Sequence, residues 1–213
     1  MSAPRPWVYS FVRSVLFIGY KAVFSFRFFA SEKVPAASYE RGVILASNHA
    51  SFLDPPILGI SVKRHVTYLA KEYLFKPLFL GWLLRSVGAL PIKTQSDDFK
   101  SIRQLIRILK NRGCIVVFPE GTRSPDGALR EAEVGVGFLA IKSGAVVVPV
   151  YIRGSYEAFP RQKKMFTPKP VSVYYGDPFV PALDKDILSN PDPYKAVGQR
   201  IMAEIKILKE KNS

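Results

Sequence analysis

The chain has 213 residues, of which 48% are hydrophobic, and a formal net charge of +14. This length is typical of one domain with a substantial core, and the hydrophobic content excludes a wholly disordered protein. The single cysteine, Cys114, excludes an internal disulfide framework and indicates a reducing compartment. The positive charge favours an anionic partner, which composition alone leaves open between phospholipid head groups, a phosphorylated substrate and nucleic acid.

Residues 7–29 are predicted to form one long amphipathic helix. At ~100° per residue, three cations (Arg13, Lys21 and Arg27) and three serines fall on one half of its circumference, and aromatic and aliphatic residues fall on the other. This pattern is typical of a helix that lies in a membrane interface, and a helix packed on a soluble core is the alternative. The cations make a membrane span costly and do not fit a secretory signal.

The rest of the chain alternates between apolar strands and helical segments. A second apolar segment, residues 74–90, contains Pro77 and Arg85 and reads as a short buried or interfacial helix. Strands are expected at 42–47, 65–70, 88–92, 114–118, 145–151 and 171–175, and helices at 55–60, 97–110, 132–142 and 193–209. We therefore predict an α/β fold whose mixed, mostly parallel sheet is covered by helices, with a membrane-associating region at 1–35 and an α/β domain at 36–213.

The segment Asn48–Asp54 follows the first of these strands and places His49 five residues before Asp54. Histidine accepts a proton near neutral pH, and a carboxylate on its other ring nitrogen fixes the tautomer that does so. The alternative is structural, because Asp54 before Pro55 is a good helix N-cap and Ser51 to Asp54 has capping-box spacing. His65, the other histidine, begins a predicted strand and is interpreted as a surface or strand residue.

A second polar turn follows the strand predicted at 114–118. It presents Glu120, Gly121, Thr122 and Arg123 in succession. Glycine allows close backbone approach, and arginine is suited to a bidentate grip on phosphate. Glu120 would hold the guanidinium of Arg123 or bind a substrate hydroxyl. The alternative is a charged surface turn with an internal ion pair. The apolar run at 144–150 is best explained by core packing.

Three segments of the chain, in this order, resemble the glycerolipid acyltransferase family: NHASFLD at 48–54, FPEGTRS at 118–124 and VVPVYIRGS at 147–155. The resemblance covers roughly residues 40–160, and it is strongest to bacterial-type 1-acyl-sn-glycerol-3-phosphate acyltransferases. Two positions depart from the family pattern. Thr94 stands where an arginine is expected, with Lys93 beside it, and Glu133 stands where a lysine is common.

This resemblance implies transfer of a fatty acyl chain from acyl-CoA or acyl-carrier protein to the free sn-2 hydroxyl of 1-acyl-glycerol-3-phosphate, giving phosphatidic acid. His49 would be the general base, Asp54 would orient it, and residues 120–123 would bind the substrate phosphate. No metal and no cofactor beyond the acyl donor are implied. The implied location is the cytoplasmic face of the bacterial inner membrane, interfacial and not spanning.

Two alternatives remain open at this point. The same chemistry could act on another acceptor, such as glycerol 3-phosphate, another lysophospholipid or an amino-lipid. A remote alternative is a basic nucleic-acid-binding module, which rests on the net charge and on a run of cations in the second half of the helical segment near 97–110. No recognised nucleic-acid motif accompanies these cations, which are Arg103, Arg107, Lys110 and Arg112.

Overall fold

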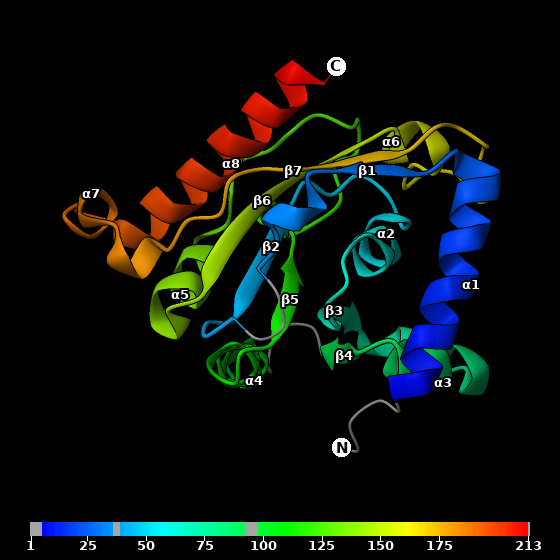
Figure 1. Cartoon of the computed structure of the whole chain (residues 1–213), viewed down its shortest axis with the longest axis horizontal. Helices are drawn as coiled ribbons and strands as arrows, with labels where there is room; N and C mark the ends of the chain where they lie inside the picture. The colour runs from blue at the N-terminus through cyan, green and yellow to red at the C-terminus, as the bar shows by residue number, and fades with distance from the viewer. Residues whose placement is uncertain (1–5, 36–38, 93–97, 213) are drawn as a thin grey trace.

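The computed structural model describes residues 6–35, 39–92 and 98–212. Its seven strands form one sheet in the order β1–β7–β6–β2–β5–β3–β4 (Figure 1). Neighbouring strands are parallel except for β6 and β7, which are antiparallel. This confirms the predicted mixed, mostly parallel sheet. The strands are β1 (Arg27–Phe29), β2 (Val43–Ser47), β3 (Val66–Lys71), β4 (Ala89–Ile92), β5 (Cys114–Val117), β6 (Val146–Arg153) and β7 (Ser172–Tyr175).

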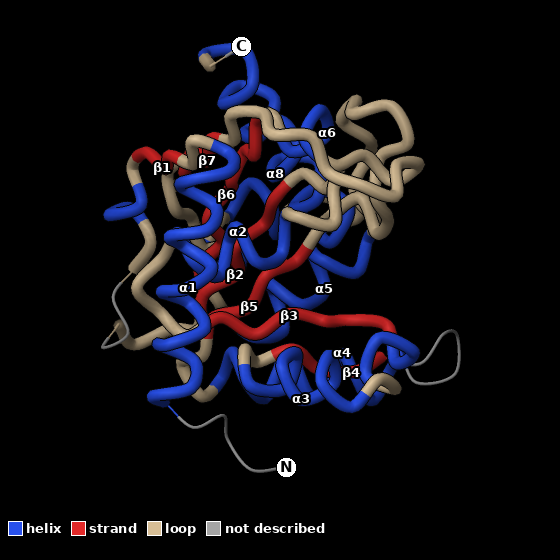
Figure 2. The backbone as a smooth tube through the Cα atoms, turned by 90° about the vertical axis from the view of Figure 1, so that its right-hand side faces the viewer, coloured by secondary structure: helices blue, strands red, loops and turns tan. Residues whose placement is uncertain are grey.

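Helices cover both faces of the sheet, as Figures 1 and 2 show. One core cluster lies beneath α1 (Pro6–Phe24), α2 (Asp54–Ser61) and α3 (Leu78–Ser86). The second lies beneath α4 (Asp98–Lys110), α5 (Val134–Ser143) and α8 (Pro193–Lys211). The strands between them are near-continuously apolar because both of their faces are buried. The described chain also contains two one-turn helices, α6 (Ser155–Ala158) and α7 (Lys185–Leu188), and three 3-10 turns (Ser31–Lys33, Glu72–Phe75 and Pro181–Leu183).

The predicted strands and the helices after residue 50 are confirmed, with ends that differ by at most two residues. The segment at 74–90 contains the short helix α3. Cys114 is buried, as expected, and burial raises the pKa of its thiol to about 12. His65 is exposed immediately before β3, with its ring against that of Tyr9.

The N-terminal helix is shorter than predicted. It ends at Phe24, because Ser25 takes a left-handed backbone conformation with φ of 46° and turns the chain into the sheet. The N–H of Val171 then donates to the carbonyl of Phe24, and the N–H of Arg27 donates to the carbonyl of Val171. The prediction of one helix over 7–29 was therefore wrong. Residues 27–29 form β1, which pairs in parallel with β7.

The predicted polar face of this helix was also wrong in part. Arg13 turns toward the protein, where its guanidinium donates to the carbonyl of Ile60 at the end of α2. The opposite side of α1 carries an exposed apolar stripe of Trp7, Phe11, Val15 and Ile18. No helix in the described part of the chain is both long and apolar enough to cross a membrane. The division of the chain at residue 35 stays a prediction.

The sheet order brings the two polar turns together. β2 and β5 are parallel neighbours, and Ala46 of β2 is in register with Val117 of β5. Because the carboxyl ends of parallel strands meet at one edge of a sheet, the chain leaves both strands at the same place. The turns that follow, 48–54 and 118–124, therefore form one site.

Candidate active site

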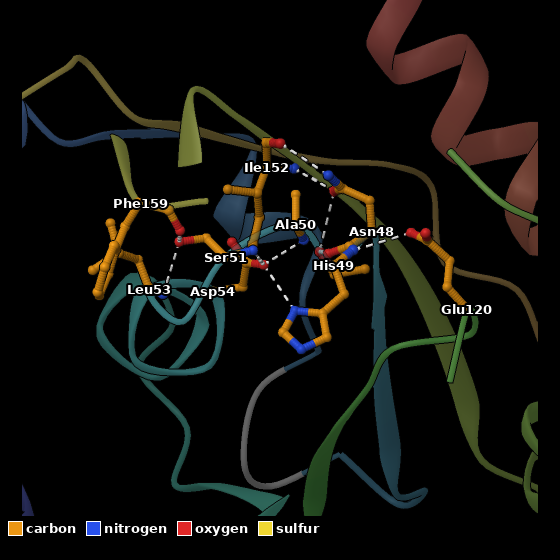
Figure 3. A network of polar contacts seen from close by, with 10 residues as sticks. Asn48, His49, Ala50, Ser51, Leu53, Asp54, Glu120, Ile152 and Phe159 are labelled. Carbon is orange, nitrogen blue, oxygen red and sulfur yellow. Dashed lines mark hydrogen bonds and ion pairs between the residues drawn. The ribbon is translucent and has the colours of Figure 1, made fainter. Parts of the chain in front are cut away.

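Asn48 fastens the loop after β2 to the neighbouring strand β6. Its side-chain amide donates to the carbonyl of Ile152 at 3.0 Å, and its side-chain oxygen accepts the N–H of Ile152 at 2.8 Å (Figure 3). Both backbone groups of one strand residue are thereby satisfied by a single buried side chain. The sequence reasoning missed this role, which fixes the position of the next residue, His49.

His49 and Asp54 are in direct contact. His49 Nδ1 lies 2.8 Å from Asp54 Oδ2, and the same oxygen accepts the N–H groups of Ala50 and Ser51, each at 2.8 Å (Figure 3). Asp54 is 0% exposed. Because Oδ2 accepts two backbone N–H groups, it carries no proton that it could donate to His49. The hydrogen in the contact with His49 therefore belongs to Nδ1. This leaves Nε2 of the neutral ring as the nitrogen that can take a proton.

The alternative of a helix cap at Asp54 is wrong. The N-cap of α2 is Leu53, which has no side-chain cap, and Asp54 is the first helical residue with its carboxylate turned back into the preceding loop. The capping box is half formed, because Asp54 Oδ2 accepts the N–H of Ser51 but Ser51 Oγ does not accept the N–H of Asp54. Ser51 Oγ accepts the N–H of Leu53 and donates to the carbonyl of Phe159 at 2.7 Å. Ser51 is excluded as a nucleophile, because it is fully buried and its hydroxyl is engaged in both of these hydrogen bonds.

Glu120 lies against the backbone of His49. Its Oε1 accepts the His49 N–H at 3.0 Å, and the N–H of Ser124 donates to the His49 carbonyl at 2.7 Å. The His49 ring stacks on Phe118, with 3.9 Å between ring centroids. Glu120 is only 3% exposed, and burial raises the pKa of its carboxyl to about 7, although the His49 N–H and the charge of Arg130 oppose the shift.

Arg123 is held by an aromatic ring instead of by Glu120. Its guanidinium lies 3.5 Å above the ring of Phe52. Within the described chain no ion pair joins Arg123 to Glu120, so the alternative of a surface turn with an internal ion pair is wrong. Arg123 Nη1 is buried and makes no hydrogen bond to a described residue. Burial lowers the pKa of this guanidinium, and an anionic ligand would satisfy it.

The rest of this turn faces solvent. Gly121 has φ of 69°, and Gly121 and Thr122 are both exposed. A side chain at Gly121 would be strained by this backbone conformation, and its Cβ would lie 3.0 Å from Cγ of Glu133. Glu133 therefore packs directly on the turn, a contact that the sequence reasoning did not foresee.

Two cavities meet at His49. The turn-side cavity, of about 490 Å³, also contains residues 121–123, Glu133 and parts of α4 and α5 in its wall. The apolar cavity, of about 430 Å³, is lined by Val12 and Leu16 of α1 and by Leu80, Leu83 and Leu84 of α3. Arg123 and Lys71 line both. Lys71 ends β3, a strand-end position that could have identified it in the sequence.

Thr94 and Lys93 lie outside the described residues. Across ranges 6–35, 39–92 and 98–212, no three His, Cys, Asp or Glu side chains lie close enough to hold a metal ion.

Comparison with known proteins agrees with this geometry. A sequence model of the acyltransferase family matches residues 25–153. The 1-acyl-sn-glycerol-3-phosphate acyltransferase of Bacillus subtilis is 28% identical over 182 residues, which are 84% of this chain and 86% of the relative. The crystal structure of the 1-acyl-sn-glycerophosphate acyltransferase PlsC from Thermotoga maritima superposes with a TM-score of 0.79 at 27% identity, and the match covers 97% of this chain and 82% of that one.

Two further relatives bear on how far the likeness extends. The chloroplast enzyme LPAT1 of Arabidopsis thaliana, named as a 1-acyl-sn-glycerol-3-phosphate acyltransferase, is 30% identical over 61% of this chain, which spans only 36% of that relative. A lyso-ornithine lipid O-acyltransferase of Pseudomonas aeruginosa is 28% identical over 63% of this chain and 52% of its own length. The relatives thus share a reaction class and differ in the named acceptor. The paired turns after β2 and β5, and a family match over more than half of the chain, establish that the protein belongs to the acyltransferase family.

Proposed function

We propose that the protein transfers a fatty acyl group from acyl-CoA or acyl-carrier protein to the sn-2 hydroxyl of 1-acyl-glycerol-3-phosphate and so makes phosphatidic acid. The observation that carries this proposal is the buried Asp54 carboxylate on Nδ1 of His49, with the His49 ring at the junction of two cavities. Such a dyad activates a hydroxyl, and the cavities give room for two substrates beside it.

His49 Nε2 takes the proton of the acceptor hydroxyl as its oxygen attacks the thioester carbonyl. Asp54 holds the ring in the required tautomer and stabilises the imidazolium that forms. When the tetrahedral intermediate collapses, the C–S bond breaks and His49 returns the proton to the thiolate. General base catalysis of this kind contributes roughly 10²–10⁴-fold to the rate.

The acyl group passes directly to the acceptor. An acyl-enzyme would need a nucleophile beside His49. Ser51 is buried with its hydroxyl donating to the carbonyl of Phe159, and Ser124 is buried with its hydroxyl donating to Asp126. The thioester is already activated, so the acceptor hydroxyl supplies the nucleophile. A covalent intermediate is not required.

The oxyanion needs a backbone or side-chain donor near the reacting carbon. The N–H groups of residues 49–51 and of Gly121 are all committed within the chain. In the described structure the N–H of Thr122 donates to no other residue, and Thr122 lines the turn-side cavity. We assign it as the donor to the oxyanion.

Arg123 is the phosphate ligand in this proposal. Its guanidinium is fixed on Phe52, lines both cavities and keeps a buried N–H group free of hydrogen bonds to the described chain. Arg123 and His49 line the same cavities, so a phosphate bound to Arg123 would position the acceptor hydroxyl near His49. Glu120 serves by holding His49 and not by touching the phosphate.

The apolar cavity is the proposed site of an acyl chain. Its walls come from the N-terminal helix and from α3, and both helices also expose large apolar side chains to solvent. Leu78 of α3 is 93% exposed, with Phe79 and Trp82 beside it. We infer that these two helices lie in a membrane interface, so that lipids enter the cavity from the bilayer.

A second acceptor class is favoured by Glu133. This exposed carboxylate packs on Gly121 and lines the turn-side cavity together with Arg123 and Arg161. A cavity with cations and a carboxylate complements a lysolipid head group that carries both an anion and an ammonium. The named acceptor of the Pseudomonas relative shows that lysolipids other than lysophosphatidate occur among the relatives.

An acceptor panel with the purified full chain tests the proposed function. The acceptors are lysophosphatidate, glycerol 3-phosphate, lysophosphatidylethanolamine and lyso-ornithine lipid, each with acyl-CoA. Transfer to lysophosphatidate with the highest kcat/KM supports the main proposal, and no transfer to any acceptor contradicts it. Preference for the amine-bearing lipids, reversed toward lysophosphatidate by Glu133→Lys but not by the neutral control Glu133→Gln, establishes the second class.

A further inference from the structure

The loop between α6 and β7 exposes apolar and basic side chains side by side. Residues 161–169, here called the basic loop, place Met165 and Phe166 at the surface with 79% and 51% of their area exposed. The cations around them are also exposed: Arg161, Lys163, Lys164 and Lys169. None of the three lysines forms an ion pair with a described residue.

The basic loop is attached to both the N-terminal helix and the active-site turns. The ring of Phe166 meets the ring of Phe24, the last residue of α1, edge to face at 5.5 Å. At the other end, the side chain of Gln162 donates to the carbonyl of Pro125 at 2.7 Å, just beyond the 118–124 turn. Arg161 lines the turn-side cavity. The loop therefore joins the end of α1 to the rim of the site.

The backbone of this loop is also held. The N–H of Thr167 donates to the carbonyl of Ala158 at 2.7 Å, and the N–H of Lys163 donates to the carbonyl of Pro160. These hydrogen bonds hold the backbone of the loop that exposes Met165 and Phe166. Burying these exposed apolar side chains would stabilise the buried state by ~25 cal/mol for each Å² of apolar surface removed from water. Clustered cations attract anionic head groups.

We propose that the basic loop is a further membrane-docking element beside α1 and α3, in which Met165 and Phe166 enter the head-group boundary and Lys163, Lys164 and Lys169 bind anionic lipid phosphates. It rests on the lipid substrates of the proposed function. An acidic acyl-carrier protein is the other partner that such charges could attract. The bilayer is favoured because Phe166 touches the end of α1, and the outer side of the same helix carries an exposed apolar stripe.

A contact at the basic loop adds to the contacts proposed for α1 and α3. Because α3 lies near the start of α1 and the basic loop touches its last residue, Phe24, contacts near both ends of α1 fix how the molecule lies on the membrane (Figures 1 and 2). Because Arg161 of the loop lines the turn-side cavity and α1 lines the apolar cavity, docking through both elements places a wall of each cavity beside the lipid.

Insertion of the loop tip can be measured on the full chain. The only native cysteine, Cys114, is buried, so Met165→Cys can be labelled selectively with an environment-sensitive dye. We expect the dye emission to rise and shift to the blue on phosphatidylcholine vesicles that contain phosphatidylglycerol. The matched control is Lys195→Cys, an exposed site at the start of α8, far from α1 in Figure 1. Emission that is unchanged at residue 165, or that shifts equally at both sites, overturns the proposal.

The lysines are tested by charge reversal. Lys163→Glu with Lys164→Glu should weaken binding to the anionic vesicles by about 30-fold or more, since each cation near the surface contributes ~1 kcal/mol. The control, Lys185→Glu with Lys195→Glu, changes the net charge equally on exposed sites of α7 and α8. Equal weakening by both pairs overturns the proposal. A second outcome also overturns the proposal: the Lys163→Glu, Lys164→Glu variant binds vesicles normally and loses turnover only when acyl-carrier protein is the donor. That outcome would make acyl-carrier protein the partner of the loop.

Turnover in detergent micelles separates this proposal from the proposed function. The loop variants should retain wild-type turnover of acyl-CoA and lysophosphatidate in micelles, because the site itself is unchanged. If the wild-type protein has no turnover in micelles, the proposed function fails, while the dye shift and vesicle affinities still decide whether the loop docks. Met165→Ser, which removes no aromatic contact, supplies a further variant that should fold normally and bind vesicles more weakly.

Discussion

The backbone N–H of His49 donates to Oε1 of Glu120, 71 positions later in the chain, at 3.0 Å. This bond joins the two polar turns that leave β2 and β5. Glu120 thereby fixes the position of the His49 backbone at the cavity. Together with the Ser124 N–H on the His49 carbonyl, it clamps both peptide groups of the proposed base. Glu120 is therefore expected to act on the reaction through His49.

Replacing Glu120 tests this positioning role. Glu120→Ala leaves a buried N–H group without an acceptor, which costs ~1–3 kcal/mol and loosens His49. We expect kcat to fall at least about tenfold on that scale with little change in the acceptor KM. Glu120→Gln keeps an oxygen acceptor and should retain most of kcat. If Glu120→Ala instead raises the acceptor KM and leaves kcat unaltered, the carboxylate binds substrate.

The raised pKa of Glu120 predicts a pH dependence of stability. Its pKa is about 7 in the folded chain against an ordinary value of 4.5. Between these values the folded state binds more protons than the unfolded state, so the contribution of Glu120 to stability falls as the pH rises from about 4.5 to about 7. At 1.36 kcal/mol per pKa unit, the loss is ~3 kcal/mol across that range.

The measurement is thermal unfolding of the wild-type chain and of Glu120→Gln across the same pH range. Glutamine does not titrate, so the difference in Tm between the two proteins should shift in favour of the variant toward pH 7. Other titrating groups cancel in this comparison. A difference in Tm that stays constant with pH, or shifts the other way, is incompatible with the raised pKa.

Asp54→Asn tests the orienting carboxylate. Asparagine retains an oxygen for the N–H groups of Ala50 and Ser51, so the loop and fold should persist, as circular dichroism would report. A neutral amide cannot stabilise the imidazolium of His49, and we expect kcat to fall by roughly 10²–10⁴-fold. A folded variant with wild-type kcat would remove Asp54 from the mechanism.

Arg123→Ala tests the phosphate ligand. Loss of the guanidinium should raise the KM for lysophosphatidate far more than the KM for acyl-CoA, because only the acceptor phosphate contacts Arg123 in the proposed complex. Arg103→Ala, at an exposed position on α4, is the matched control and should change neither constant. Equal increases in both KM values for Arg123→Ala would reject the assignment.

Leu80→Trp tests the apolar cavity. A larger side chain in its wall should shorten the space for an acyl chain and lower turnover of long-chain acyl donors relative to short-chain ones. Leu78→Trp, on the same helix but exposed, should leave this ratio as in the wild type. An unchanged ratio in Leu80→Trp would place the acyl chain elsewhere.

Much of the fold was predictable from the sequence because the buried strands are short apolar runs separated by helical segments. The end of the first helix was not. The apolar pattern continues through Phe26, Phe28 and Phe29, and nothing local distinguishes a helix from a strand there. The strand forms because residues 27–29 find β7, more than 140 positions away, which no local pattern reports.

The site was predictable to a different degree at each residue. The short spacing of His49 and Asp54 allows their contact without any long-range assembly, and the structure shows it. The partner of Glu120 was mistaken because Arg123 is its neighbour in sequence, whereas the sheet places His49 closer. Asn48 and Glu133 were missed for the same reason, since their partners, Ile152 and Gly121, are brought near only by the tertiary fold.

The most direct test of the whole account is single-turnover acyl transfer by His49→Ala, with acyl-CoA and lysophosphatidate both saturating. We predict a rate lower than that of the wild type by roughly 10²–10⁴-fold, with lysophosphatidate affinity and circular dichroism preserved. A folded His49→Ala protein that transfers the acyl group at the wild-type rate would contradict the assignment of His49 as the base, and with it the mechanism proposed for this site.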